Sequence, residues 1–395
     1  MRVLHVFYNF LPDLNGGSIR SAGIVSGQAA NGISIVCVSS PFQPGWGHAS
    51  VEDYIGIKLY RAYKKGNPLI SEAGSSIWTR IRKIFLFPGF VRLIRRVAKR
   101  EKATVIHAHS TFYCGLAAIL AARRLRIPVI YEARSLWEER GRRIGPTYRA
   151  QAVAARLLET VALRGADRVV AINLGLSRNI SARGVPGDRI FVVPNAVEDD
   201  IIRMGNSCCA PSRVRRFGYI GNISVIEGLD ILVDAFRQAF PKEQDVSLEV
   251  FGSGAYFQEL RAKVEKLGDE RVRLWGPFDR SELGSVYERV DCVVIPRRRS
   301  KLNDTVTPLK PLEAMAFKRL VCVSDVGGLL EVIGDRGNAV VFPAEDVNAL
   351  ANTLMGIYRG EIDVPGIAMR GFDFVSRERN WNAIAKKYWE VYGGL

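Results

Sequence analysis

Short apolar segments alternate with helical patterns along this 395-residue chain, and this alternation constrains the fold more than any other feature. Residues 3–7 and 33–39 are compact apolar runs, and a stretch with helical periodicity lies between them. The same order of strand and helix continues through residues 103–193. Alternation of this kind predicts an α/β protein, in which helices cover both faces of a parallel sheet.

The alternation stops once, in a polar stretch over residues 198–216 that contains Gly, Asn, Ser and Pro, and then starts again. We therefore predict two doubly wound, Rossmann-like domains over residues 1–197 and 198–375, with ligands at the carboxyl ends of the strands. Residues 376–395 form a last helix that either closes the second core or crosses back to the first domain, and we favour the crossing. Its apolar face consists of Trp381, Ile384, Tyr388, Trp389 and Tyr392.

The composition is that of an ordinary soluble globular protein, with 48% hydrophobic and 24% charged residues. These fractions exclude a disordered chain, a collagen-like chain and a disulfide scaffold. No run of about 18 apolar residues is present, so a membrane-spanning helix is not expected, and the first apolar run is too short for a signal peptide. The six cysteines have no CxxC pair and no ligand-like spacing to the four histidines, which indicates idle thiols in a reducing cytoplasm and no metal site.

The net charge of +16 is concentrated in the first half of the chain. Residues 1–200 contain 29 Lys and Arg residues against 14 Asp and Glu, whereas the remaining residues contain 27 against 26. This asymmetry indicates that the first domain faces an anionic surface or an acidic ligand. Nucleic acid is not an expected partner, because no binding motif accompanies the charge.

Residues 80–102 are strongly basic, with nine basic residues and one acidic residue. Basic residues surround the helical apolar face that follows the break at Pro88-Gly89, which consists of Phe90, Leu93, Ile94, Val97 and Ala98. A basic amphipathic helix is typical of a segment that binds an anionic membrane, although a core helix with a solvated basic face has the same pattern. We favour peripheral attachment to the inner leaflet of the membrane.

In the first domain, polar residues follow two of the predicted strands. Gly16 and Gly17 lie in the loop after the first strand, where their amides could approach an anion at a helix N-terminus, although a tight turn explains them as well. His109 lies at the carboxyl tip of a later strand. There it could donate a hydrogen bond to a ligand hydroxyl or stabilise developing charge, unless it is only a polar cap.

The most specific region of the second domain lies between residues 295 and 316. A strand ends there in a basic loop that contains Arg297, and the loop leads to a helix with proline in its first turn. Asp304 lies in the loop, and Lys310 and Glu313 lie at the start of the helix. A carboxylate at this place could accept hydrogen bonds from sugar hydroxyls, so the cluster indicates a ligand site in preference to solvated surface charge.

Several segments resemble glycosyltransferase family 4. Pro311-Leu-Glu-Ala-Met-Ala and Val321-Cys-Val-Ser-Asp-Val-Gly-Gly are similar to its donor-binding region, and Val193-Pro-Asn-Ala-Val is similar to its interdomain connector. Val306-Thr-Pro-Leu-Lys-Pro-Leu-Glu and residues 131–138 resemble the subgroup that is encoded near exosortase and exopolysaccharide systems. The resemblance covers nearly the whole chain.

The resemblance implies a GT-B fold, in which two Rossmann-like domains face a central cleft, and retaining transfer of a sugar from a UDP- or GDP-linked donor. It implies no obligatory metal or other cofactor, and a glycan or lipid-diphosphate acceptor in cell-surface polysaccharide synthesis. Glu313 would bind the ribose of the donor, and Asp304 and His109 would contact the donor sugar as catalytic residues. Arg134, Trp137 and Glu138 would line the acceptor side, unless these three residues have only a structural role.

The chain departs from the family at the positions that hold the donor diphosphate. The family usually has Gly-Arg and Lys-Gly there, whereas this chain has Gly221-Asn222 and Glu227-Gly228. Because a carboxylate would repel a diphosphate, we expect Glu227 to point away, and Asn222 to contact the donor. We expect Lys310 and Arg297 to neutralise the phosphates instead.

Two other functions are open on the sequence alone. A nucleotide-sugar epimerase of the same fold would need acid and base groups facing the sugar and would use no separate acceptor. A catalytically silent GT-B module would bind a partner or a lipid without transferring a sugar. The fold does not choose among these functions.

Overall fold

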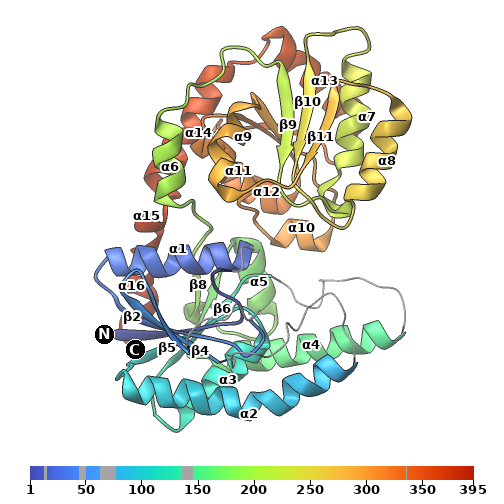
Figure 1. Ribbon diagram of the computed structural model, residues 1–395. Helices are drawn as coiled ribbons and strands as arrows, with labels where there is room; N and C mark the ends of the chain where they lie inside the picture. Colours follow the sequence, from blue (N-terminus) through green and yellow to red (C-terminus); the bar gives the residue numbers. More distant parts are fainter. Residues whose placement is uncertain (13–15, 44–49, 63–76, 136–145, 335) are drawn as a thin grey trace. The chain divides into compact units, whose positions relative to one another are not determined.

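The computed structural model describes the chain except for residues 13–15, 44–49, 63–76, 136–145 and 335 (Figure 1). The chain divides into two compact units, of which the first is Met1–Pro194 with Trp381–Leu395 and the second is Asn195–Asn380. The breaks therefore lie after residues 194 and 380, where the sequence pattern suggested 197 and 375. Each unit is built on its own sheet of parallel strands, so the predicted α/β class with two Rossmann-like sheets is confirmed.

Among the described residues, the sheet of the first unit has eight strands in the order β3-β4-β2-β1-β5-β6-β7-β8. Neighbouring strands are parallel, except that β3 and β4 form an antiparallel hairpin at one edge. The central strands are nearly continuous apolar runs because helices cover them on both faces. The strands are β1 (Arg2–Phe7), β2 (Ser34–Ser39), β3 (Val51–Tyr54), β4 (Ile57–Arg61), β5 (Val105–His109), β6 (Val129–Ala133), β7 (Arg168–Ala171) and β8 (Ile190–Val192).

Three helices lie together on one face of this sheet: α3 (Phe112–Arg123) packs against both α2 (Ile77–Arg100) and α4 (Pro146–Gly165) (Figure 1). The helix α2 continues through Pro88, so the break expected there is wrong. Of the apolar face that was expected at a membrane, Phe90, Ile94, Val97 and Ala98 are buried in the core. The structure therefore favours the core-helix explanation for this face. The helix α5 (Leu174–Ala182) connects β7 to β8.

The opposite face of the sheet is covered by α1 (Gly16–Ala30) and by the end of the chain, which forms α15 (Trp381–Ala385) and α16 (Lys387–Tyr392). The indole of Trp381 lies directly on α1, because a Cβ atom at Gly23 would be 2.0 Å from its Nε1 atom. A Cβ atom at Gly27 would be 2.5 Å from the carbonyl oxygen of Trp381. The guanidinium of Arg20 lies 5.4 Å from the indole ring centre. The two glycines therefore allow α15 to approach α1 closely.

The second unit has a parallel sheet in the order β11-β10-β9-β12-β13-β14. Its strands are β9 (Arg216–Ile220), β10 (Ser247–Phe251), β11 (Val272–Gly276), β12 (Cys292–Ile295), β13 (Leu320–Ser324) and β14 (Val340–Phe342). The polar stretch of residues 198–216, at which the sequence alternation stops, contains a helix, α6 (Asp199–Asn206). The other helices are α7 (Leu229–Ala239), α8 (Phe257–Leu267), α9 (Leu283–Glu288), α10 (Lys301–Thr305), α11 (Lys310–Ala316), α12 (Gly327–Ile333), α13 (Val347–Arg359) and α14 (Val364–Glu378). Within the described residues, no helix has both the length and the apolar character needed to span a membrane.

We expect Trp381→Ala to lower the free energy of unfolding by about 3–5 kcal/mol, because it removes the buried indole that packs directly against Gly23. Trp389→Ala is the matched control, because that indole is 46% exposed. Urea unfolding of both variants measures the difference. Equal losses for the two tryptophans would contradict the packing described here.

Candidate functional site

In each sheet the strand order reverses once, between β1 and β5 in the first unit and between β9 and β12 in the second. Doubly wound sheets bind their ligands outside the carboxyl ends of the strands at such a switch point. His109 ends β5 at the first switch point, and Arg297 follows β12 at the second. The predicted residues therefore lie at the places where the topology predicts ligands.

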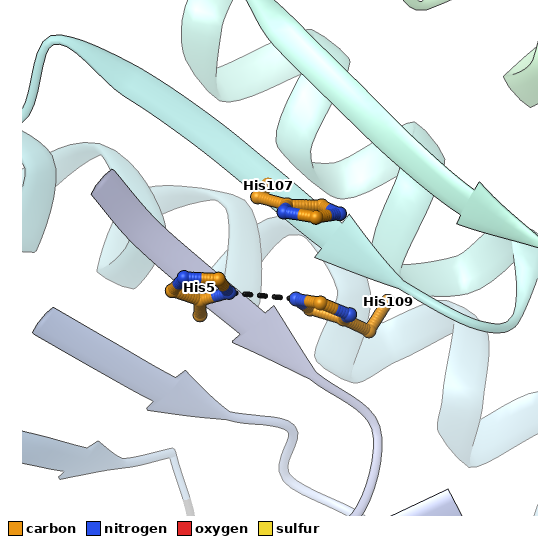
Figure 2. Close-up of side chains that lie close together, drawn as sticks. All are labelled: His5, His107 and His109. Carbon is orange, nitrogen blue, oxygen red and sulfur yellow. Dashed lines mark hydrogen bonds between the residues drawn. The ribbon is translucent and has the colours of Figure 1, made fainter. Parts of the chain in front are cut away.

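A buried polar cluster lies at the switch point of the first unit. His5 on β1, His107 and His109 on β5, and Glu132 on β6 interrupt strands that are otherwise mostly apolar, and all four side chains are buried. Figure 2 shows the imidazoles together, with a hydrogen bond between His5 and His109. Buried polar groups are costly unless they are hydrogen-bonded, so the partners of this cluster decide its chemistry.

Glu132 is the charged centre of this cluster. It accepts hydrogen bonds from Arg20 Nε at 3.1 Å, from Arg134 Nε at 2.8 Å and from the Tyr388 hydroxyl at 2.6 Å. Burial alone would raise the pKa of Glu132, but Arg20 and Arg134 hold it well below its ordinary range. The carboxylate is therefore ionised near pH 7, and it binds α1, β6 and α16 together.

The hydrogen bonds of His109 have only one possible direction. Arg134 Nη2 can only donate, so His109 Nδ1 accepts at 2.8 Å, and the proton of the neutral ring is on Nε2. His109 Nε2 then donates to His5 Nδ1 at 2.7 Å, and His5 Nε2 donates to Gln28 Oε1 at 3.0 Å. The tautomers of both histidines are thus determined by an arginine.

The same chain of hydrogen bonds continues to the end of the protein. Gln28 Nε2 donates to the Tyr392 hydroxyl at 2.9 Å, and that hydroxyl forms a hydrogen bond of 2.8 Å with His107 Nδ1. His107 Nε2 lies 3.7 Å from a Glu132 oxygen. Tyr392 on α16 thus belongs to the hydrogen-bonded cluster that orients His109.

The three imidazoles are neutral near pH 7. Burial lowers the pKa of His109 to about 4. Burial, together with the neighbouring His109, lowers the pKa of His5 and of His107 well below the ordinary value of 6.5. At the tip of β5, His109 is consequently a hydrogen-bonding group without a positive charge.

The composition of this cluster is that of a metal site, but its geometry is not. One nitrogen from each of His5, His107 and His109 lies within 4.8 Å of the others. However, the rings of His107 and His109 are stacked, with centroids 4.1 Å apart and an interplanar angle of 26° (Figure 2). The lone pair of an imidazole nitrogen lies in the ring plane, so stacked rings do not aim at one ion. The geometry favours a hydrogen-bonded cluster.

A cationic cluster lies at the switch point of the second unit, around Glu227 in the turn before α7. Arg297 donates to both carboxylate oxygens, with Nε 3.2 Å from Oε2 and Nη2 3.0 Å from Oε1. Lys310 Nζ lies 2.9 Å from Oε1 of the same carboxylate. Glu227 was expected to point away from a donor diphosphate; it instead pairs with the two cations that were expected to bind that diphosphate. Two buried cations need a counterion, and Glu227 provides it while leaving one net positive charge.

Protonation in the cationic cluster follows from its burial and its charges. Burial alone would raise the pKa of Glu227, but Lys310 and Arg297 outweigh it and hold the pKa at about 2. Burial lowers the pKa of Lys310 to about 8, against the opposing effect of Glu227. Near pH 7 the carboxylate is ionised and Lys310 is still mostly protonated.

The loop after β9 lies against Lys310. Gly221 has φ of 142°, and a Cβ atom there would be 2.4 Å from Lys310 Cε, so only glycine leaves room for the lysine. Lys310 Nζ donates to the Tyr219 hydroxyl at 2.5 Å, and that hydroxyl donates to the backbone oxygen of Asn222 at 2.6 Å. The side chain of Asn222 is exposed. The loop, the lysine and the carboxylate thus form one connected group.

The two predicted sugar and ribose carboxylates lie nearby on α10 and α11. Asp304 is exposed, and its Oδ1 accepts a hydrogen bond from the amide of Gly327 at 2.9 Å, at the start of α12. Glu313 is partly exposed in the first turn of α11, and burial raises its pKa. Their roles toward a donor stay predictions.

The structure places the remaining predicted residues as follows. Gly16 and Gly17 begin α1 and are exposed. Arg134 is directed into the first unit, where its Nη1 donates to the Gly17 carbonyl at 2.7 Å. Trp137 and Glu138 lie outside the described residues.

Glu132 and Arg20 were not predicted as site residues, and Tyr392 was expected only as part of an apolar helix face. A glutamate inside an apolar strand was a visible signal, because a buried carboxylate needs cations. Its partner Arg20 lies 112 residues away in the sequence, and spacing alone gives no sign of that pairing.

We expect the free energy of unfolding to fall as the pH is lowered from about 6.5 to about 4. The folded protein keeps its three clustered histidines neutral, whereas the unfolded chain binds protons below a pKa of 6.5. Each histidine lowers the free energy of unfolding by up to about 1.4 kcal/mol for each pH unit of acidification in this window. The pKa values of Glu132 and Glu227 are lowered in the folded protein, so protonation of these residues in the unfolded chain reduces the free energy of unfolding further only below about pH 4.5. Urea unfolding at several pH values between 5 and 7 measures the slope, and a flat profile would contradict neutral buried histidines.

We expect Tyr392→Phe to lower the free energy of unfolding by about 1–3 kcal/mol, because it leaves Gln28 Nε2 and His107 Nδ1 each without this hydrogen-bond partner in the core. Tyr113→Phe is the control, because that hydroxyl makes one long bond of 3.3 Å to a backbone oxygen. Thermal and urea unfolding compare the two variants. An equal or smaller loss for Tyr392→Phe would argue against the continuous hydrogen-bond chain.

Two family profiles match this chain. The one described as "Glycosyl transferase 4-like domain" matches residues 15–196, and the one described as "Glycosyl transferases group 1" matches residues 214–359. The alpha-maltose-1-phosphate synthase of Mycolicibacterium smegmatis is 27% identical over 331 residues, which are 76% of this chain and 81% of that protein.

Solved structures have the same fold. Sucrose-phosphate synthase from Thermosynechococcus elongatus superposes with a TM-score of 0.74 at 20% identity, over 99% of this chain and 98% of that chain. HepE of Anabaena, solved in complex with UDP, superposes with a TM-score of 0.70 at 17% identity, over 100% of both chains. Together with the two matched domains, these likenesses identify the chain as a glycosyltransferase of the GT-B type.

Proposed function

We propose that this glycosyltransferase moves a sugar, with retention of configuration, from a UDP- or GDP-linked donor to a glycan or lipid-diphosphate acceptor in cell-surface polysaccharide synthesis. The reaction is proposed to need no metal ion. A relative named as a sugar-phosphate synthase and a structural neighbour that binds UDP support a nucleotide-sugar donor. The observation that carries the proposal is the cationic cluster of Glu227, Arg297 and Lys310 at the switch point of the second unit.

The charge of this cluster suits a leaving diphosphate. Its two cations and one carboxylate leave one net positive charge in a mostly buried place, where electrostatic interactions are stronger than in water. As the bond between the anomeric carbon and the diphosphate breaks, negative charge grows on the leaving oxygen. Fixed cations stabilise that charge without reorganising, which lowers the barrier.

In the proposed route no protein nucleophile attacks the sugar. The acceptor hydroxyl forms its bond to the anomeric carbon on the face that the diphosphate leaves, and its proton passes to a diphosphate oxygen. Glu313 binds the ribose, Asp304 and neutral His109 contact the sugar, and Gly16, Gly17 and Asn222 contact the donor. Positioning and electrostatics then supply most of the rate enhancement.

The acceptor side and the location of the enzyme belong to the same proposal. Trp137 and Glu138 are assigned to the acceptor side, whereas the buried Arg134, which donates to Glu132 and to the Gly17 carbonyl, has the structural role. The protein works in the cytoplasm on the inner face of the membrane. The basic side of residues 80–102 attaches it there. The net charge of the first half supports this location, because a lipid-diphosphate acceptor and the inner leaflet are both anionic.

We expect UDP or GDP to raise the melting temperature without added metal, and one of the corresponding nucleotide sugars to raise it further. Arg297→Gln and Lys310→Met should each weaken binding of that nucleotide by about tenfold or more, since each removes a charge-assisted contact to the diphosphate. Arg299→Gln is the matched control from the same loop, because its guanidinium is 54% exposed and binds both carboxylate oxygens of Asp325 at 2.7 Å.

The outcomes separate the proposal from its rivals. Unchanged binding in both Arg297→Gln and Lys310→Met would remove the cationic cluster from the donor site. No response of the wild-type protein to any nucleotide, in EDTA or with Mg²⁺, would favour a silent module. Conversion of the bound sugar nucleotide into its epimer without an acceptor would identify an epimerase.

A further inference from the structure

The outer side of α4 carries an apolar row that the sequence analysis did not identify. Val153, Leu157, Leu158 and Val161 are 58%, 62%, 41% and 57% exposed, respectively. Val153, Leu157 and Val161 are four residues apart and Leu158 lies three residues before Val161, so the four share one side of the helix, where the exposed Ala150 and Ala154 adjoin them. Contiguous exposed apolar surface of this kind marks an interaction site. We call these four large side chains the α4 row.

Neighbouring helices add apolar residues to the same face of the unit. Ile84 and Phe85 on α2 are 73% and 79% exposed, and Leu120 on α3 is 44% exposed. Because α3 packs against both α2 and α4, the three helices form one layer (Figure 1). The layer therefore exposes large apolar side chains on each of its three helices.

The charge of this layer indicates what covers it. The three helices contain twelve Lys and Arg residues and one acidic residue, Glu159. Glu159 is buried, where it accepts hydrogen bonds from the Tyr131 hydroxyl and the Phe112 amide. Exposed arginines adjoin the α4 row at positions 149, 156 and 164. The outward side of the layer is thus apolar and cationic.

We propose that this layer is a membrane-binding surface, in which the α4 row inserts into the boundary between headgroups and acyl chains of an anionic bilayer. An amphipathic helix with arginines beside its apolar face lies in such an interface, because apolar insertion and attraction to anionic lipids act together. A second copy of this chain fits the surface poorly, since the interface would bring two sets of these cations together.

On this surface the main helix that enters the lipid is α4, not α2. The apolar face of residues 90–98 is buried in the core, so it cannot enter the lipid. To the membrane surface α2 contributes its basic side and the exposed Ile84 and Phe85, while the α4 row contributes most of the inserted apolar area. The proposal of a membrane-binding surface rests on the proposed function only in that the enzyme works at the inner leaflet. The α4 row itself is independent of the donor site in the second unit.

Co-sedimentation with vesicles of phosphatidylcholine alone, and of phosphatidylcholine with phosphatidylglycerol, tests the proposal. We expect the wild-type protein to bind the phosphatidylglycerol vesicles at physiological salt and to bind less as salt is raised. The double variant Leu157→Ser/Val161→Ser should lose about tenfold or more in affinity. Ile55→Ser is the matched control, because Ile55 is 63% exposed in the turn between β3 and β4, at an edge of the sheet.

Three results would overturn the proposal: no vesicle binding by the wild-type protein, equal binding by the double variant, or a wild-type dimer in light scattering that the double variant converts to a monomer. The nucleotide thermal shift is measured on the same samples. If UDP or GDP raises the melting temperature of the wild-type protein but the protein does not bind vesicles, only the membrane-surface proposal is refuted. A protein that binds vesicles but no nucleotide would refute the donor site alone.

Discussion

A carboxylate buried at a switch point of a sheet requires cations beside it, and this requirement organises both units. In the first unit Glu132 is held by Arg20 and Arg134, and in the second Glu227 is held by Arg297 and Lys310. Removing one partner of such a group leaves an uncompensated buried charge, which costs several kcal/mol. Each group joins segments that are far apart in the sequence at the switch point of its sheet. The same charges that stabilise the fold thus also determine what each switch point can bind.

Much of the fold could be predicted from the sequence, because strands buried on both faces are apolar runs and the crossover helices between them have a different period. The presence of cations at this switch point could also be predicted, since Arg297 follows a strand end and Lys310 begins a helix. Their binding of a donor diphosphate stays a proposal. The orientation of Glu227 could not. Repulsion between a carboxylate and a diphosphate suggested that Glu227 points away, but the need of two buried cations for a counterion has the larger effect.

Two features could not be predicted from the sequence: which side chains pair over long sequence distances, and which helix faces are exposed. The hydrogen bonds that connect Tyr392 to Gln28 and His107 span 364 and 285 residues, and nothing in local spacing indicates them. The sequence shows that residues 90–98 have an apolar face, but only packing shows that this face is in the core. Conversely, the apolar residues of α4 resemble those of a core helix in the sequence, and the structure leaves them exposed. Which amphipathic helix faces water is decided by tertiary packing.

The most direct test of the central claim, that the cationic cluster binds the donor diphosphate, is the pH dependence of UDP and GDP affinity between about pH 7 and 8.5. Burial lowers the pKa of Lys310 to about 8, so its charge falls within this range, whereas an arginine stays protonated. We predict that calorimetric affinity of the wild-type protein decreases as the pH rises, and that the affinity of Lys310→Arg stays nearly constant. The same decrease in both proteins, or no decrease in the wild type, would contradict the claim.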